Sequence, residues 1–80
     1  MFSNRTQDGR NNICGVVGAK MRKGLRISQR ELADRLSNAG FLIDKNAVQR
    51  IESGQRFVTD IELITISMVL HVSINDLLGI

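Results

Sequence analysis

The spacing of apolar residues along the chain predicts helices rather than strands. Ile13, Val17 and Met21 recur every four positions, which places them on one side of a helix. No stretch keeps the alternation of apolar and polar residues that is typical of a half-buried strand. The first predicted helix begins at Asn12 and ends at Gly24. Because internal glycines lower its helix propensity, packing against the rest of the molecule must stabilise it.

Capping motifs mark where the later helices begin. Ser28 and Glu31 have the spacing of a capping box, in which each side chain accepts a hydrogen bond from the backbone N–H of the other. Thr59 and Glu62 repeat this spacing, and Asp44 is the expected N-cap of the helix before them. The second to fifth helices are therefore predicted over residues 28–38, 45–53, 59–70 and 73–79. The pattern indicates an all-α, compact five-helix domain.

The fourth predicted helix presents a wide apolar face, which is the pattern of a helix packed against a core. Ile61, Ile64 and Met68 follow one another at helical spacing on this face. The neighbouring positions that widen it are Leu63, Ile66 and Leu70.

The third predicted helix has two chemically different sides. Ala47, Val48 and Ile51 share one side and are spaced for burial. The other side carries no apolar side chain, and its residues are Lys45, Asn46, Gln49, Arg50 and Ser53. Asn and Gln can bond adenine, and Arg and Lys can bond guanine, so this side suits a DNA major groove. A solvated helix side has the same pattern, so this observation alone leaves both interpretations open.

The composition limits the chain to one small domain. A chain of 80 residues buries only about 60% of the surface of its unfolded state, so self-association would add stability. One Cys and one His allow no internal disulfide and are too few for a zinc site. No apolar run is long enough to span a membrane, and the polar N-terminus lacks the apolar stretch of a signal peptide. We therefore expect a cytoplasmic protein with no metal, cofactor or membrane partner.

Charge is distributed unevenly along the chain. Residues 1–30 carry seven basic residues and one acidic residue, a net charge of +6, whereas residues 31–80 carry four basic and seven acidic residues, a net charge of −3. A basic region on a small domain suggests a polyanionic partner, most often a nucleic acid. A basic solvated surface without such a partner would have the same composition.

Several stretches match one family when they are taken in order. They are Ser28–Ala33 (SQRELA), Val48–Gly54 (VQRIESG), Glu62–Leu63 (EL) and Val69–Leu78 (VLHVSINDLL). With these stretches the chain resembles the Cro/lambda-repressor-like, or XRE-type, helix-turn-helix family over residues 12–79. The resemblance implies a lambda-repressor-like DNA-binding domain over residues 12–80, preceded by a polar segment, residues 1–11, that we predict to be a flexible N-terminal arm.

Functional roles follow from the resemblance position by position. It implies base contacts at Lys45, Asn46 and Arg50, with Gln49 beside them. It implies phosphate contacts at Gln29, Ser53, Gln55 and Arg56. It also implies that Arg22, late in the first helix, forms a structural ion pair with Glu52. A phosphate contact for Arg22 and a solvated position for Glu52 are the alternatives.

The chain departs from the usual family pattern between the second and third helices. Ala33 precedes Val48 by fifteen residues, where the usual pattern has ten, and the extra residues fall within Ser37–Ile43. The chain is similar to a branch of the family that has such an extended turn. The insertion leaves the contact side intact but changes the expected angle between the two helices.

The extended turn is unusually apolar. Phe41, Leu42 and Ile43 are consecutive apolar residues, and their exposure would leave a sticky patch on a small domain. We therefore predict that at least two of them pack beneath the corner formed by the second and third helices. A dimer or partner surface at this turn is the alternative.

No group of side chains indicates an enzyme. His71 has no Cys, Asp or Glu at ligand spacing and is expected at a helix end, and Cys14 is expected in the core. Neither an acid–base pair nor an activated nucleophile is evident.

The predicted function is a sequence-specific, double-stranded-DNA-binding transcriptional regulator, most simply a repressor. Its operator is expected to be pseudo-palindromic, which requires a homodimer. The expected dimer contact is the N-terminal arm or the fifth helix with its neighbours Leu77, Leu78 and Ile80. One alternative is an antitoxin or another protein-interaction module on the same fold. Another is a structural or RNA-binding helical module.

Overall fold

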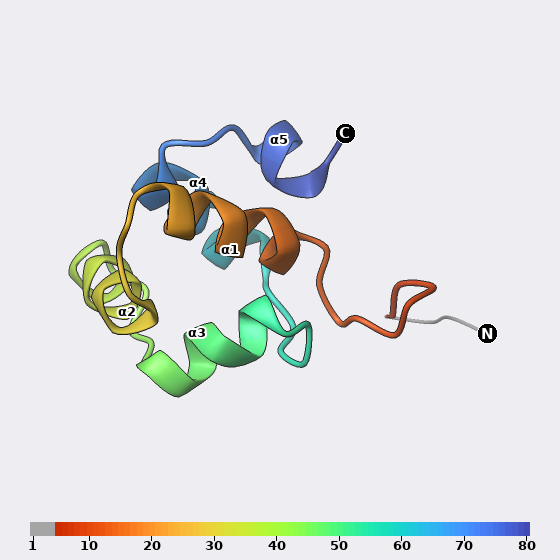
Figure 1. The fold of residues 1–80 in the computed structure, drawn as a ribbon, viewed down its shortest axis with the longest axis horizontal. Helices are drawn as coiled ribbons and strands as arrows, with labels where there is room; N and C mark the ends of the chain where they lie inside the picture. Colours follow the sequence, from red (N-terminus) through yellow and green to blue (C-terminus); the bar gives the residue numbers. More distant parts are fainter. Residues whose placement is uncertain (1–4) are drawn as a thin grey trace.

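The computed structural model describes residues 5–80, and within this range it contains five helices and no strand (Figure 1). The helices are α1 (Cys14–Gly24), α2 (Gln29–Asn38), α3 (Lys45–Glu52), α4 (Asp60–Leu70) and α5 (Ile74–Leu78). The predicted all-α, five-helix fold is therefore confirmed. Among these helices none is long and apolar enough to cross a membrane.

Side-chain caps begin four of the helices, as the sequence predicted. The capping residues of α2 to α5 are Ser28, Asp44, Thr59 and Ser73. Thr59 and Glu62 form a complete capping box. The capping box predicted at Ser28 and Glu31 is only half formed. Ser28 accepts from the Glu31 N–H at 3.0 Å, but the Glu31 carboxylate accepts from Arg35 at 2.7 Å. A charged donor one turn later forms the stronger hydrogen bond.

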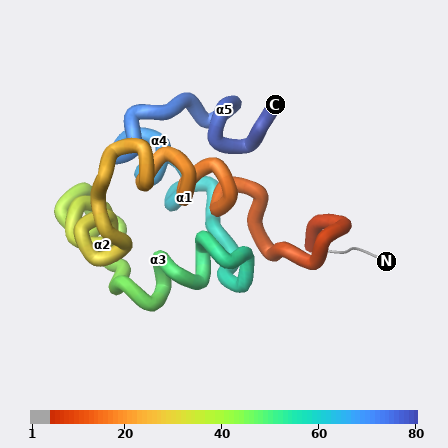
Figure 2. Tube along the Cα trace, in the orientation of Figure 1, coloured from red at the N-terminus to blue at the C-terminus, as the bar shows by residue number. Residues whose placement is uncertain are grey.

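The core lies where all five helices meet. Helix α1 packs against α3, α4 and α5, and α2 packs against α3 and α4 (Figure 2). Each of α2 to α5 contributes one side chain that is almost fully buried, namely Leu36, Val48, Leu70 and Leu77. Leu77 is 0% exposed, so the expectation that it contributes to a dimer contact is wrong.

The inward side of α1 differs from the predicted one. Ile13 was expected on the buried side but is 55% exposed, and Val17 and Met21 are only partly buried. The buried positions of α1 are Cys14, Gly15, Gly18 and Arg22. Glycine lets the helix backbone itself approach its neighbours, so the small residues face inward and the larger Ile13 faces solvent.

The apolar residues of α4 divide between two environments. Ile66 and Leu70 belong to the core, and Leu63 packs against it. Ile61, Ile64 and Met68 were predicted on the same packed face, but all three are exposed. Apolar residues occur around the whole circumference of α4, so α1, α2 and α5 together cover only part of them.

The extended turn is packed against the core, as predicted. Phe41 is 8% exposed, and Ile43 is partly buried against the core, whereas Leu42 is 85% exposed. Ser37 organises the turn, because its Oγ donates to the Ile43 carbonyl at 3.1 Å and lies 3.3 Å from the Ile43 N–H. The turn therefore presents a defined start to α3.

Candidate nucleic-acid interface

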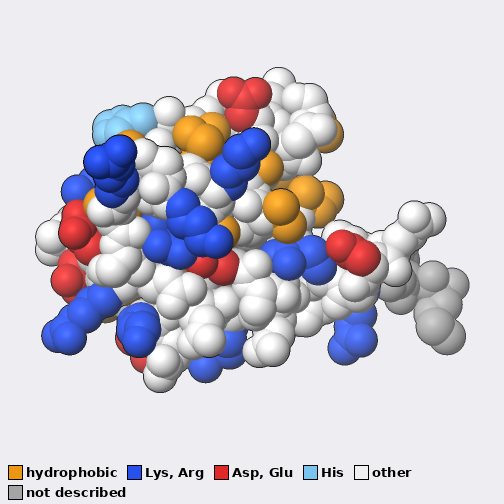
Figure 3. Space-filling model, viewed as in Figure 1, with side chains coloured by type: hydrophobic (Ala, Val, Ile, Leu, Met, Phe, Trp, Pro, Cys, Tyr) orange, Lys and Arg blue, Asp and Glu red, His pale blue; other side chains and the backbone are white. Residues whose placement is uncertain are grey.

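The polar side of α3 faces solvent along the whole helix. Its exposed residues are Lys45, Asn46, Gln49 and Arg50, followed by Ser53 just after the helix. On the opposite side Val48 and Ile51 are 1% and 6% exposed, and their burial fixes the rotation of the helix about its axis. Lys and Arg side chains lie along the lower edge of the molecule in Figure 3, where Figure 1 shows α3.

Four polar side chains on this side have no partner within the described part of the chain, whereas the Ser53 hydroxyl donates to the Arg50 carbonyl at 3.2 Å. Among residues 5–80, the side chains of Lys45, Asn46, Gln49 and Arg50 form no hydrogen bond or ion pair. Their donors and acceptors are therefore available to a ligand. Amide and cationic groups on one exposed helix side can bond base edges in a major groove.

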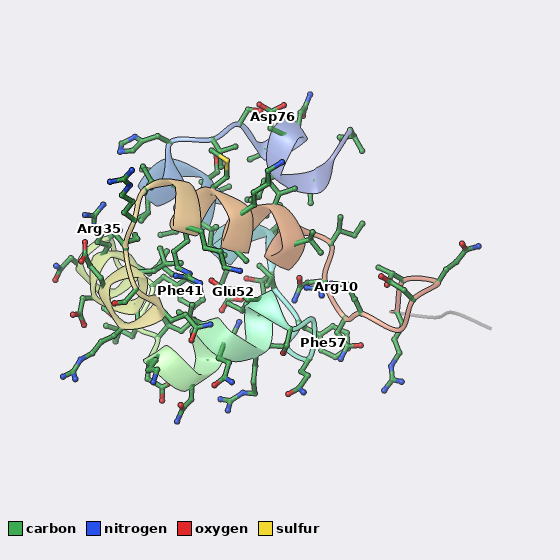
Figure 4. All side chains as sticks on the ribbon, in the orientation of Figure 1. Arg10, Arg35, Phe41, Glu52, Phe57 and Asp76 are labelled. Atoms are coloured by element: carbon green, nitrogen blue, oxygen red, sulfur yellow. The ribbon has the colours of Figure 1, made fainter. Side chains whose placement is uncertain are left out.

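A buried ion pair connects the end of α3 to α1. Arg22 Nε lies 2.7 Å from Glu52 Oε2, and Arg22 Nη2 lies 3.2 Å from Glu52 Oε1. Both side chains are 11% exposed, and Figure 4 shows Glu52 between the two helices. Arg22 Nη1 also donates to the Ile27 carbonyl at 2.7 Å. The structure thus brings together the two residues that the family resemblance pairs.

Gln29 joins this ion pair from the start of α2. Its Nε2 donates to Glu52 Oε1 at 3.0 Å, so part of its side-chain amide is engaged within the protein. Gln29 is also the first residue of α2, where backbone N–H groups have no partner inside the helix. The position therefore combines a connection to α3 with the anion-attracting end of a helix.

The N-terminal segment, residues 10–12, binds the same C-terminal end of α3 through its backbone carbonyls. Arg10 Nη2 donates to the carbonyls of Ile51 and Glu52, at 3.3 and 2.8 Å. Asn12 Nδ2 donates to the Ile51 carbonyl at 3.0 Å and the Arg56 carbonyl at 2.7 Å. Carbonyls in the last turn of a helix lack helical partners, so these donors satisfy them.

This role of the N-terminal segment was not predicted from the sequence. Arg10, Asn11 and Asn12 offer a guanidinium and two amides, which are suitable donors for a helix end, but the target lies about forty residues away. The flexible arm predicted over residues 1–11 stays a prediction about motion. Its first four residues lie outside the described part of the chain.

Glycine permits an unusually close approach between α1 and α3. A Cβ at Gly15 would lie 2.1 Å from the Ile51 carbonyl oxygen, which is closer than real contacts allow. Gly54 has a φ of +85°, and a Cβ there would lie 2.8 Å from the Arg10 guanidinium carbon. The position of α3 therefore depends on two residues that lack side chains.

The loop after α3 supplies the remaining predicted contact residues. Ser53 and Gln55 are exposed, and the Gln55 carbonyl accepts from Asn11 Nδ2 at 2.8 Å. The Arg56 guanidinium is instead engaged, since it donates to both carboxylate oxygens of Glu62, at 3.1 and 3.2 Å. Its Cζ also lies 5.5 Å from the centroid of the Phe41 ring. The hydrogen bonds from Arg56 hold the pKa of Glu62 below its ordinary value.

Two reactive residue types lie away from this surface. Cys14 is 3% exposed, and burial raises the pKa of its thiol, so the reactive thiolate is disfavoured. His71 is the left-handed C-cap of α4, in agreement with its predicted position at a helix end.

A family model described as Helix-turn-helix matches residues 19–77, which include all of α2 to α4 and most of α1 and α5. Searches of curated proteins and of solved structures give no significant match. The family match includes the exposed polar side of α3 and the ion pair behind it.

Proposed function

The chain belongs to the XRE-type helix-turn-helix family of DNA-binding domains, and from this premise we propose that it is a sequence-specific transcriptional repressor. The observation that carries the proposal is the polar side of α3, which is exposed and free of apolar residues. Its side chains Lys45, Asn46, Gln49 and Arg50 have no partner among residues 5–80. Helix α3 would enter the major groove of double-stranded DNA, with its buried side turned toward α1 and α2.

Base contacts are proposed for the exposed residues of α3. Asn46 and Gln49 would bond adenine through their side-chain amides, and Lys45 and Arg50 would bond guanine. These residues lie within two helical turns, which is the length of helix that a single major groove accommodates. Because α3 is fixed at both ends, its side chains meet the bases at a defined angle.

Phosphate contacts are proposed on both sides of α3. Gln29 would bind phosphate through the backbone N–H at the start of α2, since its side chain already supports Glu52. Ser53 and Gln55, which follow α3, would contact the phosphate backbone of the DNA. Arg56 would reach a phosphate only by giving up part of its pairing with Glu62.

The proposed working form is a cytoplasmic homodimer on a pseudo-palindromic operator. One copy offers one α3 and therefore one half-site, and operators for such domains mirror the two-fold symmetry of the protein. A dimer would bind both half-sites at once, so the binding free energies of the two half-sites would combine.

Selection of binding sites from random duplex DNA tests the proposal. We expect an enriched motif with two related halves. Affinity for this motif should fall with salt at a log–log slope of about −4 to −5 per protein copy, because four to six phosphate contacts release counterions. Failure to enrich any motif, or a flat salt dependence, would overturn the proposal.

A further inference from the structure

Helix α4 carries a stripe of exposed apolar side chains that no other described element covers. Ile61, Ile64 and Met68 are 74%, 49% and 65% exposed, and their spacing of three and four residues places them on one side of the helix. Leu42, from the extended turn, is 85% exposed and lines the same shallow depression as Ile61. We name these four residues the α4 stripe.

The stripe is large for so small a domain. Four aliphatic side chains with these exposures present on the order of 400–500 Å² of apolar surface, the size at which a patch marks an interaction site. The other side of α4 already buries Ile66 and Leu70 in the core. A helix that is apolar on both sides is typically covered on both sides.

We propose that the α4 stripe is the contact surface between two copies of this chain. The copies would pack their α4 helices antiparallel across a two-fold axis that passes near Ile64 and Thr65. Ile61 of each copy would then lie beside Met68 of the other copy. A two-fold interface needs a self-complementary surface, and the stripe contains no charged residue that would meet its own copy.

The charges at the two ends of α4 favour a second copy in this orientation. Asp60 lies at the N-terminal end of the helix, and His71 is its C-cap, and both are exposed. In the antiparallel arrangement Asp60 approaches His71 of the second copy, whose imidazole can donate a hydrogen bond to a carboxylate. A parallel arrangement would instead place Asp60 against its own copy.

The area is sufficient for a stable contact. A specific interface buries about 800 Å² on each partner, and the stripe supplies more than half of this area as apolar surface. Thr65 and the polar ends of α4 supply a rim. None of these residues belongs to α3, so the contact leaves the proposed base-contact side uncovered.

A second exposed apolar set provides the matched control. Ile13, the residue just before α1, and Val16 on α1 are 55% and 56% exposed, and Ile80 beyond α5 is 82% exposed. The apolar side chains between α1 and α5 are visible in Figure 3. These residues lie near α5, where the sequence predicted a dimer contact. Leu77 cannot be part of that contact, because it is buried. The two sets are similar in exposure but differ in location.

Sedimentation of the full chain without DNA tests the inference. We expect a concentration-dependent dimer with twice the mass of the 8.9 kDa chain. Combining Ile61→Lys with Met68→Lys should weaken dimerisation at least about 100-fold, which is the loss expected when charges enter an apolar interface. Combining Ile13→Lys with Val16→Lys should leave it unchanged. A monomeric wild type, a dimeric stripe variant, or a monomeric control would each overturn the inference.

A second measurement covers the case in which the stripe variant does not fold. Ile64→Cys places a thiol near the proposed axis and should give a disulfide-linked dimer on mild oxidation, whereas Val16→Cys should not. Cys14 is buried and does not compete. The opposite result would overturn the inference.

The inference extends the homodimer of the proposed function, and its failure is separable from a failure of DNA binding. If the stripe variant is monomeric but still binds a half-site, both the surface and the DNA-binding function are supported. If it is monomeric and wild type shows no sequence preference, the proposed function fails while the dimer surface stands.

Discussion

Helix α1 contacts α3 and α4 in two different ways. Against α3 the approach is between backbones, since a Cβ at Gly15 would lie 2.1 Å from a carbonyl oxygen of α3. Against α4 and α5 the contact is between side chains, since a Cβ at Gly18 would lie 3.9 and 4.0 Å from Leu77 and Leu70. The first contact is reinforced by the Arg22–Glu52 ion pair, whereas the second places Gly18 against the apolar side chains of Leu70 and Leu77.

The solvent-facing sides of α3 and α4 differ in the same way, since one is polar and the other is apolar. Helix α3 presents amides and cations, and α4 presents aliphatic side chains. Polar contacts are directional, so they fix the angle of the helix that must meet base edges. Apolar contacts tolerate small shifts, which suits a helix whose outer side meets another apolar surface.

The largest effect is expected from Gly15→Ala, which breaks the close contact with α3. The added methyl group cannot fit beside the Ile51 carbonyl, so α1 and α3 must separate, at a cost of about 4 kcal/mol or more. Thermal unfolding should show a very low Tm or no folded state. Gly18→Ala is the matched control and should change stability by less than about 1 kcal/mol. Equal losses at the two positions would contradict the distinction between the contacts.

The next effect concerns the ion pair behind α3. Arg22→Met leaves the Glu52 carboxylate almost buried without its cation, which should cost about 3–5 kcal/mol in denaturant unfolding. Glu52→Gln alone should also destabilise the domain. The double variant should lose less than the sum of the two, because neither charge is then unpaired. Strict additivity in this cycle would show that the two charges act independently.

Phe41→Ala tests the apolar support near the start of α4. Phe41 is 8% exposed and lies beneath the Arg56 guanidinium, so its removal should cost about 3 kcal/mol. Leu42→Ala, one position later but 85% exposed, should change monomer stability by less than about 0.5 kcal/mol. Calorimetry at a concentration where the protein is monomeric separates the two. A similar loss from both variants would mean that Leu42 is buried within the monomer.

A smaller effect, confined to DNA binding, is expected on the outer side of α3. Asn46→Ala and Arg50→Ala should each weaken binding to the selected site by about 1–3 kcal/mol and relax the preference at one base pair, with an unchanged Tm. Ile64→Ala on α4 should not alter affinity for an isolated half-site. Uniform weakening on all sequences by both α3 variants would show that another surface contacts the bases.

The smallest effect is a dependence on pH at the ion pair between Arg56 and Glu62 of α4. Hydrogen bonds from Arg56 hold the pKa of Glu62 below its ordinary 4.5. A lowered folded-state pKa adds stability that is complete above the unfolded-state pKa and is lost as pH falls through the folded-state value. The difference in Tm between wild type and Glu62→Gln should therefore shrink below about pH 4.5. A constant difference down to pH 2 would exclude this linkage.

Local features of this fold could be predicted from the sequence. Asp44 and Thr59 begin helices because their side-chain oxygens accept from N–H groups three residues later, so both partners are visible in a short stretch of sequence. The two sides of α3 were also predictable, because apolar Val48 and polar Asn46 alternate with the helical period.

Features that depend on distant partners were not predictable in this way. The outer side of α4 was missed because Ile61 and Ile66 are both apolar, and periodicity cannot tell which of them meets the core. The tie from Arg10 to Glu52 was missed because the two residues are 42 positions apart. The Arg22–Glu52 contact joins residues 30 positions apart, and only resemblance to a family indicated it.

The N-terminal segment couples its own detachment to the local unfolding of α3. Because Arg10 and Asn12 satisfy carbonyls at the end of α3, the last turn of that helix cannot open unless the segment also detaches. We therefore expect the two stretches to unfold locally as one cooperative unit, although about forty residues separate them. A protease that cuts within residues 10–12 would loosen a helix end in the middle of the chain.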